Sequence, residues 1–280
     1  MSEYVGVAGS GPSAAFFDLD RTLISGSSAF TLAIAARSAG MIPTREFLRD
    51  GVGALTFKLL GASDGTTNGA RDRALSFVEG QRQDDLSALN ERVLPTLLAK
   101  IRPEARRLLD LHRRAARATY IVSAAPQEIV GPLAQSLGMA GGIGTRGEVV
   151  DGVYTGRLAG PFCYGPGKVE AIRELARWDG LDLAQCYAYS DSASDLPMLE
   201  AVGHPVAVNP DKKLERTARR NGWPVVHFSQ RSKQVIRRTV AVAGTTAVAG
   251  ASFVAGTRVG RRHRSIIPRS IIPRSITPWG

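Results

Sequence analysis

The feature that most constrains this chain is a short apolar run, 14–17, that ends directly in the carboxylates Asp18 and Asp20. Such a run is typical of a strand that is buried on both faces of a parallel sheet. Four further runs have the same character, at 119–123, 186–191, 205–209 and 224–228. Helical patterns lie between the runs, for example at 103–116 and 168–178. This alternation predicts an α/β fold with a doubly wound parallel sheet.

One long segment, 30–100, breaks the alternation because it has helical patterning, a turn-rich stretch at 61–69 and no convincing strand. A shorter segment, 144–160, alternates polar and apolar residues around an Asp-Gly pair and predicts a β-hairpin. These patterns divide the chain into four predicted parts. They are a flexible N-terminus at 1–13, a core domain formed by 14–29 and 101–228, a helical cap at 30–100, and a basic tail at 229–280.

Four carboxylates carry the chemical argument. Asp18 and Asp20 are two residues apart, so the pleat of an extended chain points both the same way. Asp191 and Asp195 follow another predicted strand, and parallel strands end at a common edge of the sheet. Clustered carboxylates are costly to bury without a cation, and an all-oxygen ligand set suits Mg²⁺, which keeps several water ligands. The sequence therefore predicts a magnesium site at this edge.

Two more residues are placed to bind an anion. Ser123 ends a predicted strand, and Lys168 begins a helix after Gly165 and Gly167, where backbone N–H groups and a cation favour phosphate. Taken singly, a strand-end Asp is more often a helix cap, a Ser a turn residue and a Lys a solvated charge. Their order and their placement at strand ends favour phosphoryl transfer through an aspartyl phosphate.

Residues 18–22, Ser123, Lys168 and 191–195 together resemble the four motifs of the haloacid dehalogenase (HAD) superfamily of hydrolases, and the resemblance covers about 14–228. The helical insert and the hairpin resemble the phosphoserine phosphatase-like branch, subfamily IB, which has a type 1 cap. The resemblance implies a Rossmann-like core and a Mg²⁺-dependent phosphomonoester hydrolase. The implied substrate is a small phosphorylated metabolite or a lipid-related phosphate.

The resemblance also implies a role for each motif residue. Asp18 attacks phosphorus, while Asp20 protonates the leaving alkoxide and then activates water. The metal is held by the side chains of Asp18 and Asp191 and by the backbone carbonyl of Asp20. Ser123 and Lys168 bind the oxygens of the transferring phosphoryl group.

Supporting residues and departures from the family pattern refine this picture. Thr22 is expected to brace the loop after the nucleophile, and Asp195 to orient Lys168 or a metal-bound water. Ser194 stands where a related sequence commonly has asparagine, which removes one amide near the phosphate. Gly26 stands where phosphoserine phosphatases carry an acidic residue that meets the substrate amine. Phosphoserine is therefore doubtful as the substrate.

The net charge of +11 comes from the end of the chain, because 216–280 has 13 of the 36 Lys and Arg residues and no acidic residue. An uncharged stretch, 239–257, lacks Leu and Ile and is flanked by arginines. Adhesion to an anionic membrane surface and a disordered or protein-packed helix are equal alternatives for it. A five-residue repeat closing on proline, 264–278, predicts an extended end.

With two cysteines in the whole chain, a disulfide scaffold is excluded and a reducing setting is favoured. We expect a cytoplasmic protein, with peripheral attachment at the inner membrane face as an alternative, and no specific nucleic-acid partner. Two other functions stay open. One is a phosphotransferase of the same fold, and the other is a catalytically silent protein that binds membrane or nucleic acid through its tail. The intact Asp20 counts against the silent protein.

Overall fold

The computed structural model of the chain describes residues 13–41, 71–72, 75 and 78–228. In chain order, its elements are β1 (Ala14–Phe17), α1 (Ser28–Ser38), α4 (Gln83–Ala88), α5 (Asn90–Ala99), α6 (Pro103–Arg114), β2 (Ala118–Pro126), α7 (Gln127–Ser136), β3 (Gly141–Thr145), β4 (Gly147–Val150), β5 (Val153–Leu158), α8 (Pro166–Asp179), η1 (Leu183–Gln185), β6 (Tyr187–Ser190), η2 (Ala193–Asp195), α9 (Leu196–Glu200), β7 (His204–Val208), α10 (Lys212–Arg220) and β8 (Val225–Val226).

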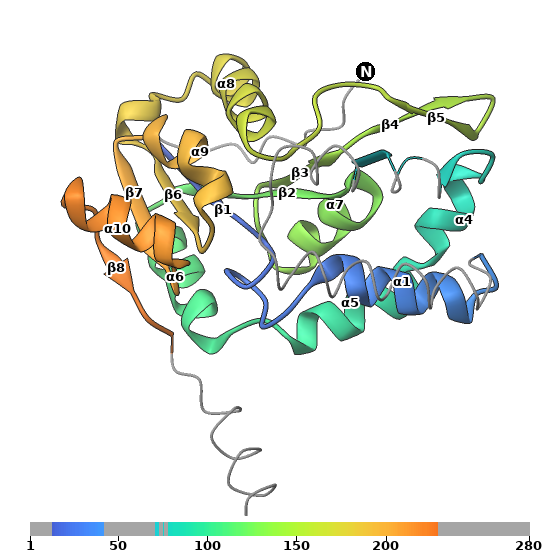
Figure 1. Cartoon of the computed structure of the whole chain (residues 1–280), viewed down its shortest axis with the longest axis horizontal. Helices are drawn as coiled ribbons and strands as arrows, with labels where there is room; N and C mark the ends of the chain where they lie inside the picture. Colours follow the sequence, from blue (N-terminus) through green and yellow to red (C-terminus); the bar gives the residue numbers. More distant parts are fainter. Residues whose placement is uncertain (1–12, 42–70, 73–74, 76–77, 229–280) are drawn as a thin grey trace, which may run out of the picture. The chain divides into compact units, whose positions relative to one another are not determined.

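Six strands form one sheet in the order β3-β2-β1-β6-β7-β8, and all of its neighbouring strands are parallel (Figure 1). The first strand, β1, lies between β2 and β6, so Phe17 is opposite Ile121 on one side and Tyr189 on the other. The predicted doubly wound α/β fold is confirmed, because helices follow the strands and cover both faces of the sheet.

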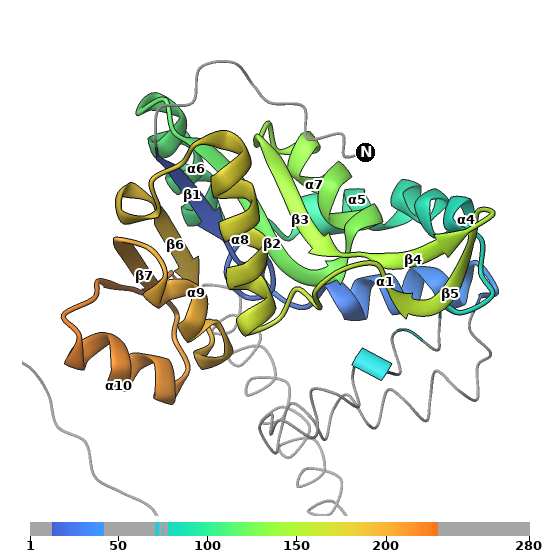
Figure 2. The same ribbon diagram turned by 90° about the horizontal axis from the view of Figure 1, so that it is seen from above.

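The two faces of the sheet bury two separate apolar cores. Ala15 and Phe17 of β1 lie in the core that also contains residues of α5, α6 and α7. Ala14 and Phe16, the alternate residues, lie in the core formed with α8, α9 and α10. Figure 2 shows α8 on one side of the sheet and α6 and α7 on the other. This double burial explains why the β1 sequence is apolar at every position rather than at every second one.

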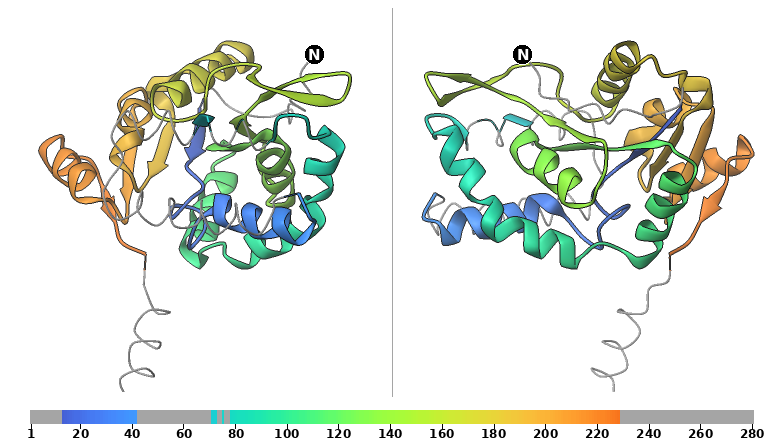
Figure 3. Two further views of the ribbon diagram at one scale, coloured as in Figure 1. Left: turned by 45° about the vertical axis from the view of Figure 1, so that its right-hand side comes forward. Right: turned by 180° about the vertical axis from the view of Figure 1, so that it is seen from behind.

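The helical insert enters and leaves the core at one place, because the amide of Ser25 donates to the backbone oxygen of Lys100 at 2.9 Å. Within the insert, α1 and α5 lie side by side (Figure 3). Val93 of α5 is fully buried in the same core as Ile129 of α7, so the end of the insert packs directly on the sheet-covering helix. The stretch 61–69 lies outside the described residues, and the domain boundaries stay predictions.

The predicted hairpin is confirmed as the antiparallel pair β4 and β5. Its turn holds Asp151 at φ 51° and Gly152 at φ 78°, the left-handed conformation that an Asp-Gly hairpin turn requires. One strand is missing from the sequence-based expectation, β3 at the edge of the sheet. Its sequence, Gly-Gly-Ile-Gly-Thr, is too rich in glycine to predict a strand.

Glycine is needed in β3 because α7 packs very closely on it. A Cβ atom on Gly142 would lie 2.5 Å from the backbone oxygen of Val130, and one on Gly144 would lie 2.8 Å from the backbone nitrogen of Gln127, the first residue of α7. The expectations for 1–12 and 229–280, including the stretch 239–257 and the repeat 264–278, fall outside the described residues. Within the described ranges, no helix is both long and apolar enough to cross a membrane.

Candidate active site

Asp18 and Asp191 follow neighbouring strands of the sheet. β1 ends at Phe17, and the amide of Asp18 donates to the backbone oxygen of Tyr189 in β6 at 2.9 Å. β6 ends at Ser190, so Asp191 emerges beside Asp18 at the same carboxyl edge. Both side chains are buried. Two acids from distant parts of the sequence therefore share one site, as the strand pattern predicts.

Lys168 joins this site to a third acid. Its Nζ atom lies 2.6 Å from Oδ1 of Asp18 and 2.8 Å from Oδ2 of Asp195, and all three side chains are almost fully buried. The hydroxyl of Ser190 also donates to Oδ2 of Asp195, at 2.7 Å. Asp195 is thus held by two donors and holds Lys168 in turn, which is the geometry expected of a residue that orients the lysine. Sequence reasoning missed Ser190, although it directly precedes Asp191.

Burial and charge shift the pKa values of these groups. Burial raises the pKa of Asp18 to about 7 against the opposing effect of Lys168. Burial also raises the pKa of Asp191 to about 7, and the Arg21 guanidinium opposes the rise. For Lys168, burial alone lowers the pKa, but Asp18 and Asp195 outweigh burial and raise it. The site therefore holds more negative charge than its one buried lysine neutralises.

Asp20 lies at the start of α1 rather than against the lysine. Its Oδ1 atom accepts a hydrogen bond of 2.7 Å from the amide of Ser28, the first residue of that helix. Burial raises the pKa of Asp20, while the hydrogen bond from Ser28 limits the rise. The helix N-terminus thus holds the carboxyl group in place and favours its charged form.

Thr22 is buried in the loop after β1, but its hydroxyl has no hydrogen-bond partner among the residues that the structure describes. The loop is closed instead by backbone hydrogen bonds from Arg21 to Gly26 (3.1 Å) and from Ile24 to Leu19 (3.0 Å). Backbone hydrogen bonds therefore close this loop, and the role of Thr22 in bracing it stays a prediction.

Ser123 lies on β2 at the same edge of the sheet as Asp18. Ile121 is opposite Phe17, so Ser123 stands just beyond the end of β1. The side chain is buried, and its hydroxyl oxygen accepts a hydrogen bond of 3.2 Å from the amide of Ala125. The hydroxyl proton is free to be donated to an anion at the end of the strand.

Arg21 is a site residue that sequence reasoning did not single out. Its Nε atom lies 2.8 Å from Oδ2 of Asp191, and its side chain is 53% exposed. Arg21 has φ 63°, a left-handed backbone conformation that is uncommon outside glycine. An exposed guanidinium on a buried carboxylate supplies a cation that can move away when a stronger one binds.

The loop after Asp191 is fixed by a second unpredicted residue, Asp211. Its amide donates to the backbone oxygen of Asp191 at 2.8 Å, and its Oδ2 atom accepts from the amide of Ala193 at the same distance. Ser194 donates its hydroxyl to Ser192 at 3.0 Å. Ser194 is therefore part of a small turn network.

The described residues contain no cluster of three or more Asp, Glu, His or Cys side chains arranged to hold a metal ion. The expected set for Mg²⁺ is smaller, namely the carboxylates of Asp18 and Asp191 and the backbone carbonyl of Asp20. These groups fit a magnesium ion because it keeps several waters and needs few protein ligands. Burial raises the pKa of both carboxylates, and a bound cation would favour their charged forms.

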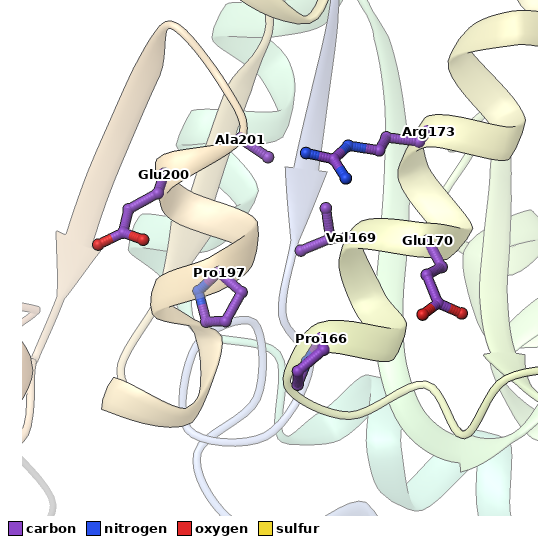
Figure 4. Close-up of a pocket in the computed structure, with 7 residues that line it drawn as sticks. All are labelled: Pro166, Val169, Glu170, Arg173, Pro197, Glu200 and Ala201. Carbon is purple, nitrogen blue, oxygen red and sulfur yellow. The ribbon is translucent and has the colours of Figure 1, made fainter.

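A cavity of about 360 Å³ has none of these carboxylates in its lining. It is lined by Pro166, Val169, Glu170, Arg173, Pro197, Glu200 and Ala201 (Figure 4). These residues come from α8 and α9 and include none of the predicted site residues. The site is therefore defined by the carboxyl ends of the strands and not by this groove.

Comparison with known proteins agrees with the geometry. The haloacid dehalogenase-like hydrolase family matches residues 15–200. Phosphoserine phosphatase SerB1 of Mycobacterium tuberculosis is 42% identical over 219 residues, which cover 77% of this chain and 70% of that protein. A probable phosphatase of the same species is 41% identical over 226 residues, or 80% and 78% of the two chains.

A solved structure of a Bordetella pertussis protein with unknown function superposes with a TM-score of 0.69 at 28% identity, covering 78% of this chain and 99% of that one. The match to the family spans most of the described core, including the ends of β1, β2 and β6. The chain therefore belongs to the haloacid dehalogenase-like hydrolase family and is one of its phosphatases.

Proposed function

We propose that this phosphatase hydrolyses phosphomonoesters with Mg²⁺ through an aspartyl phosphate on Asp18. The observation that carries the proposal is the buried contact of 2.6 Å between Lys168 and Asp18. A carboxylate fixed by a lysine at the end of a parallel strand is oriented for attack, and the same ammonium group can meet the oxygens of a phosphoryl group.

The first half of the reaction forms the covalent intermediate. An oxygen of Asp18 bonds to phosphorus as the bond between phosphorus and the leaving oxygen breaks. Asp20 gives its proton to that oxygen, so the product leaves as an alcohol. The raised pKa of Asp20 suits it to carry this proton, and Ser28 keeps its carboxyl group in place.

The second half regenerates the enzyme. Asp20, now ionised, takes a proton from water, whose oxygen bonds to phosphorus as the bond to Asp18 breaks. Inorganic phosphate leaves, and atoms and charges balance over the two halves. Ser123 and Lys168 bind the oxygens of the phosphoryl group in both halves. When bound by Asp18, Asp20 and Asp191, Mg²⁺ would supply positive charge for the phosphoryl oxygens.

The substrate is proposed as a small phosphorylated metabolite. The relative SerB1 is named for phosphoserine, whereas Gly26 gives this chain no side chain at the position where phosphoserine phosphatases are expected to carry an acid. A lipid-related phosphate is the alternative within the same chemistry. Attachment of the tail to an anionic membrane surface stays a separate prediction.

The test is hydrolysis of p-nitrophenyl phosphate by the full chain, with and without Mg²⁺, compared with Asp18→Asn. We expect turnover that needs Mg²⁺ and that is lost in the variant. Activity that survives in Asp18→Asn would reject Asp18 as the nucleophile. Adding a small alcohol separates a hydrolase, which releases only inorganic phosphate, from a phosphotransferase, which makes a new phosphate ester.

A further inference from the structure

Strands β2 and β3 and the loop before α8 meet at the hydroxyl group of Thr145, the last residue of β3. This hydroxyl donates to the backbone oxygen of Ala124 at 2.9 Å, and its oxygen accepts a hydrogen bond of 3.3 Å from the amide of Cys163. Figure 2 shows the chain returning from β5 past the ends of β2 and β3 to the start of α8. One hydroxyl group therefore joins β2 to the loop that precedes α8.

Both of these segments lead to a residue that we propose binds the phosphoryl group. Ala124 directly follows Ser123 in β2. Cys163 lies in the loop that leads to Lys168, in the first turn of α8. The Thr145 hydroxyl is therefore bonded to the chain beside Ser123 on one side and to the chain before Lys168 on the other.

The loop between Cys163 and Lys168 is tightly packed. The amide of Tyr164 donates to the backbone oxygen of Phe162 at 2.7 Å, and the amide of Gly167 donates to that of Tyr164 at 3.0 Å. A Cβ atom on Gly167 would lie only 1.9 Å from the backbone oxygen of Phe162. Because this loop has so little free space, a shift of Cys163 also shifts Lys168.

Cys163 has a second contact with β3 through its side chain. The residue is buried, and its Sγ atom donates to the backbone oxygen of Ile143 at 3.6 Å. Burial raises the pKa of this thiol to about 12, and a hydrogen bond from the backbone of Ser123 opposes the rise. A thiol with such a pKa stays protonated, so it acts as a packing group and not as a nucleophile. The amide and the thiol of Cys163 are thus both fixed by residues of β3.

We propose that Thr145 is a positioning residue, which sets the separation of Ser123 and Lys168 through the two hydrogen bonds of its hydroxyl group. The oxygens of one phosphoryl group lie at fixed distances from each other, so two residues that bind them must also be held at a fixed separation. Thr145 acts through the neighbouring chain and does not touch the reacting atoms. This inference rests on the proposed phosphatase function, which assigns Ser123 and Lys168 to the phosphoryl oxygens.

The experiment removes the hydroxyl group while the shape of the side chain is kept. Thr145→Val is compared with Thr145→Ser in hydrolysis of p-nitrophenyl phosphate with Mg²⁺ and in inhibition by inorganic phosphate. Thr145→Val should lower kcat/KM by about tenfold, because a misplacement of about 1 Å costs roughly a hundredfold in rate. It should also raise the inhibition constant of phosphate severalfold. Thr145→Ser keeps both hydrogen bonds and should stay within about twofold of the wild type in both values.

Thr155 offers a matched control in the hairpin. Its hydroxyl group also has two partners, because it donates to the carboxylate of Glu148 and accepts a hydrogen bond of 3.3 Å from the amide of Arg157. Thr155→Val removes the same kind of pair, and it should keep the kcat/KM of the wild type. Melting curves of all variants give the folded fraction at the assay temperature, so that unfolding is not counted as lost turnover.

A double-mutant cycle separates positioning from a general loss of rigidity. If Thr145 acts by placing Ser123, its replacement should cost less once the serine hydroxyl is gone. The fall in kcat/KM from Thr145→Val should therefore be smaller in Ser123→Ala than in the wild-type background. An equal fall in both backgrounds would reject the positioning role.

The second variant, Cys163→Ala, tests the same inference if Thr145→Val does not fold. It removes the thiol contact with β3 and should lower kcat/KM severalfold while raising the inhibition constant of phosphate. Wild-type kinetics in every folded variant of the two would reject the inference and leave the phosphatase mechanism intact, as would an equal loss in Thr155→Val. If the wild type hydrolyses no phosphomonoester at all, the proposed function itself is rejected.

Discussion

The ammonium nitrogen of Lys168 lies 2.6 Å from a carboxylate oxygen of Asp18, although 150 residues separate the two in the chain. The contact forms because the carboxyl end of the central strand β1 meets the start of α8, which begins with Pro166 and Gly167. It brings together the proposed nucleophile and the proposed phosphate ligand in one buried pair. Several measurable properties depend on this pair.

Replacing the lysine should cost both stability and activity. Lys168→Met leaves Asp18 and Asp195 buried without their cation, and breaking a buried ion pair from one side costs about 3–5 kcal/mol. Urea unfolding at neutral pH measures this loss. The control Lys212→Met removes an exposed lysine and should change the free energy of unfolding by less than about 0.5 kcal/mol. Equal stability of the two variants would show that the buried contact is not formed in solution.

The pH dependence of stability follows from Asp18. Its pKa in the folded state, about 7, is above its ordinary value of 3.8, so the folded chain keeps the proton to higher pH than the unfolded chain does. The carboxylate then makes the metal-free protein less stable as pH rises from about 4 to about 7. Asp18→Asn removes this effect, so without Mg²⁺ the variant should melt above the wild type at pH 8 and level with it near pH 4.

Comparing the wild type with Asp18→Asn also cancels an effect of His112, which makes stability depend on pH in the opposite direction. Burial lowers the pKa of His112 to about 4, so the folded state loses stability as pH falls below the ordinary histidine value. Both proteins contain His112, and the difference between their melting temperatures cancels its contribution. A variant that melts below the wild type at pH 8 would contradict the account of Asp18.

Magnesium should stabilise the protein through Asp191. At 100 times its dissociation constant, a ligand of the folded state adds about 2.7 kcal/mol. We expect Mg²⁺ to raise the melting temperature of the wild type at pH 8 and to have little effect on Asp191→Asn. Asp151→Asn, at the exposed hairpin turn where asparagine is equally well accommodated, is the matched control and should respond like the wild type. A full response in Asp191→Asn would place the metal elsewhere.

Much of the fold could be predicted because its signals are local. Each signal lies within a few residues of sequence: the apolar run that ends at Asp18, the Asp-Gly turn of the hairpin, and the spacing of apolar residues in each helix. β3 could not be predicted in this way. Its glycines at 142 and 144 reflect the backbone of α7 packed against them, a contact that exists only in the folded chain.

The residues of the site also differ in whether local sequence patterns could predict them. Asp18, Asp191 and Lys168 could be placed together from strand ends and chain order, since parallel strands bring their carboxyl ends to one edge. Arg21, Ser190 and Asp211 could not, because each acts through a partner that the local pattern does not reveal. Thr22 is a motif residue whose buried hydroxyl has no hydrogen-bond partner in the described part of the chain, and its bracing of the loop stays a prediction.

The start of α8 packs tightly against the preceding loop at Phe162, which gives a further prediction. A Cβ atom on Gly167 would lie 1.9 Å from the backbone oxygen of Phe162, so Gly167→Ala must move the start of the helix that carries Lys168. We expect a loss of about 1–3 kcal/mol in the free energy of unfolding and a large fall in kcat. Gly131→Ala, within α7, would place its Cβ atom 3.3 Å from Nε2 of Gln127, which a shift of a few tenths of an ångström relieves, and should cost much less.

The most direct test of the central claim is to trap the intermediate on Asp18. The full chain is mixed with p-nitrophenyl phosphate and Mg²⁺, then treated with borohydride, which reduces an acyl phosphate to an alcohol. Peptide mass spectrometry should find Asp18 converted to homoserine, and no conversion without substrate. Conversion at another carboxylate, or hydrolysis of the substrate with Asp18 unmodified, would contradict the account.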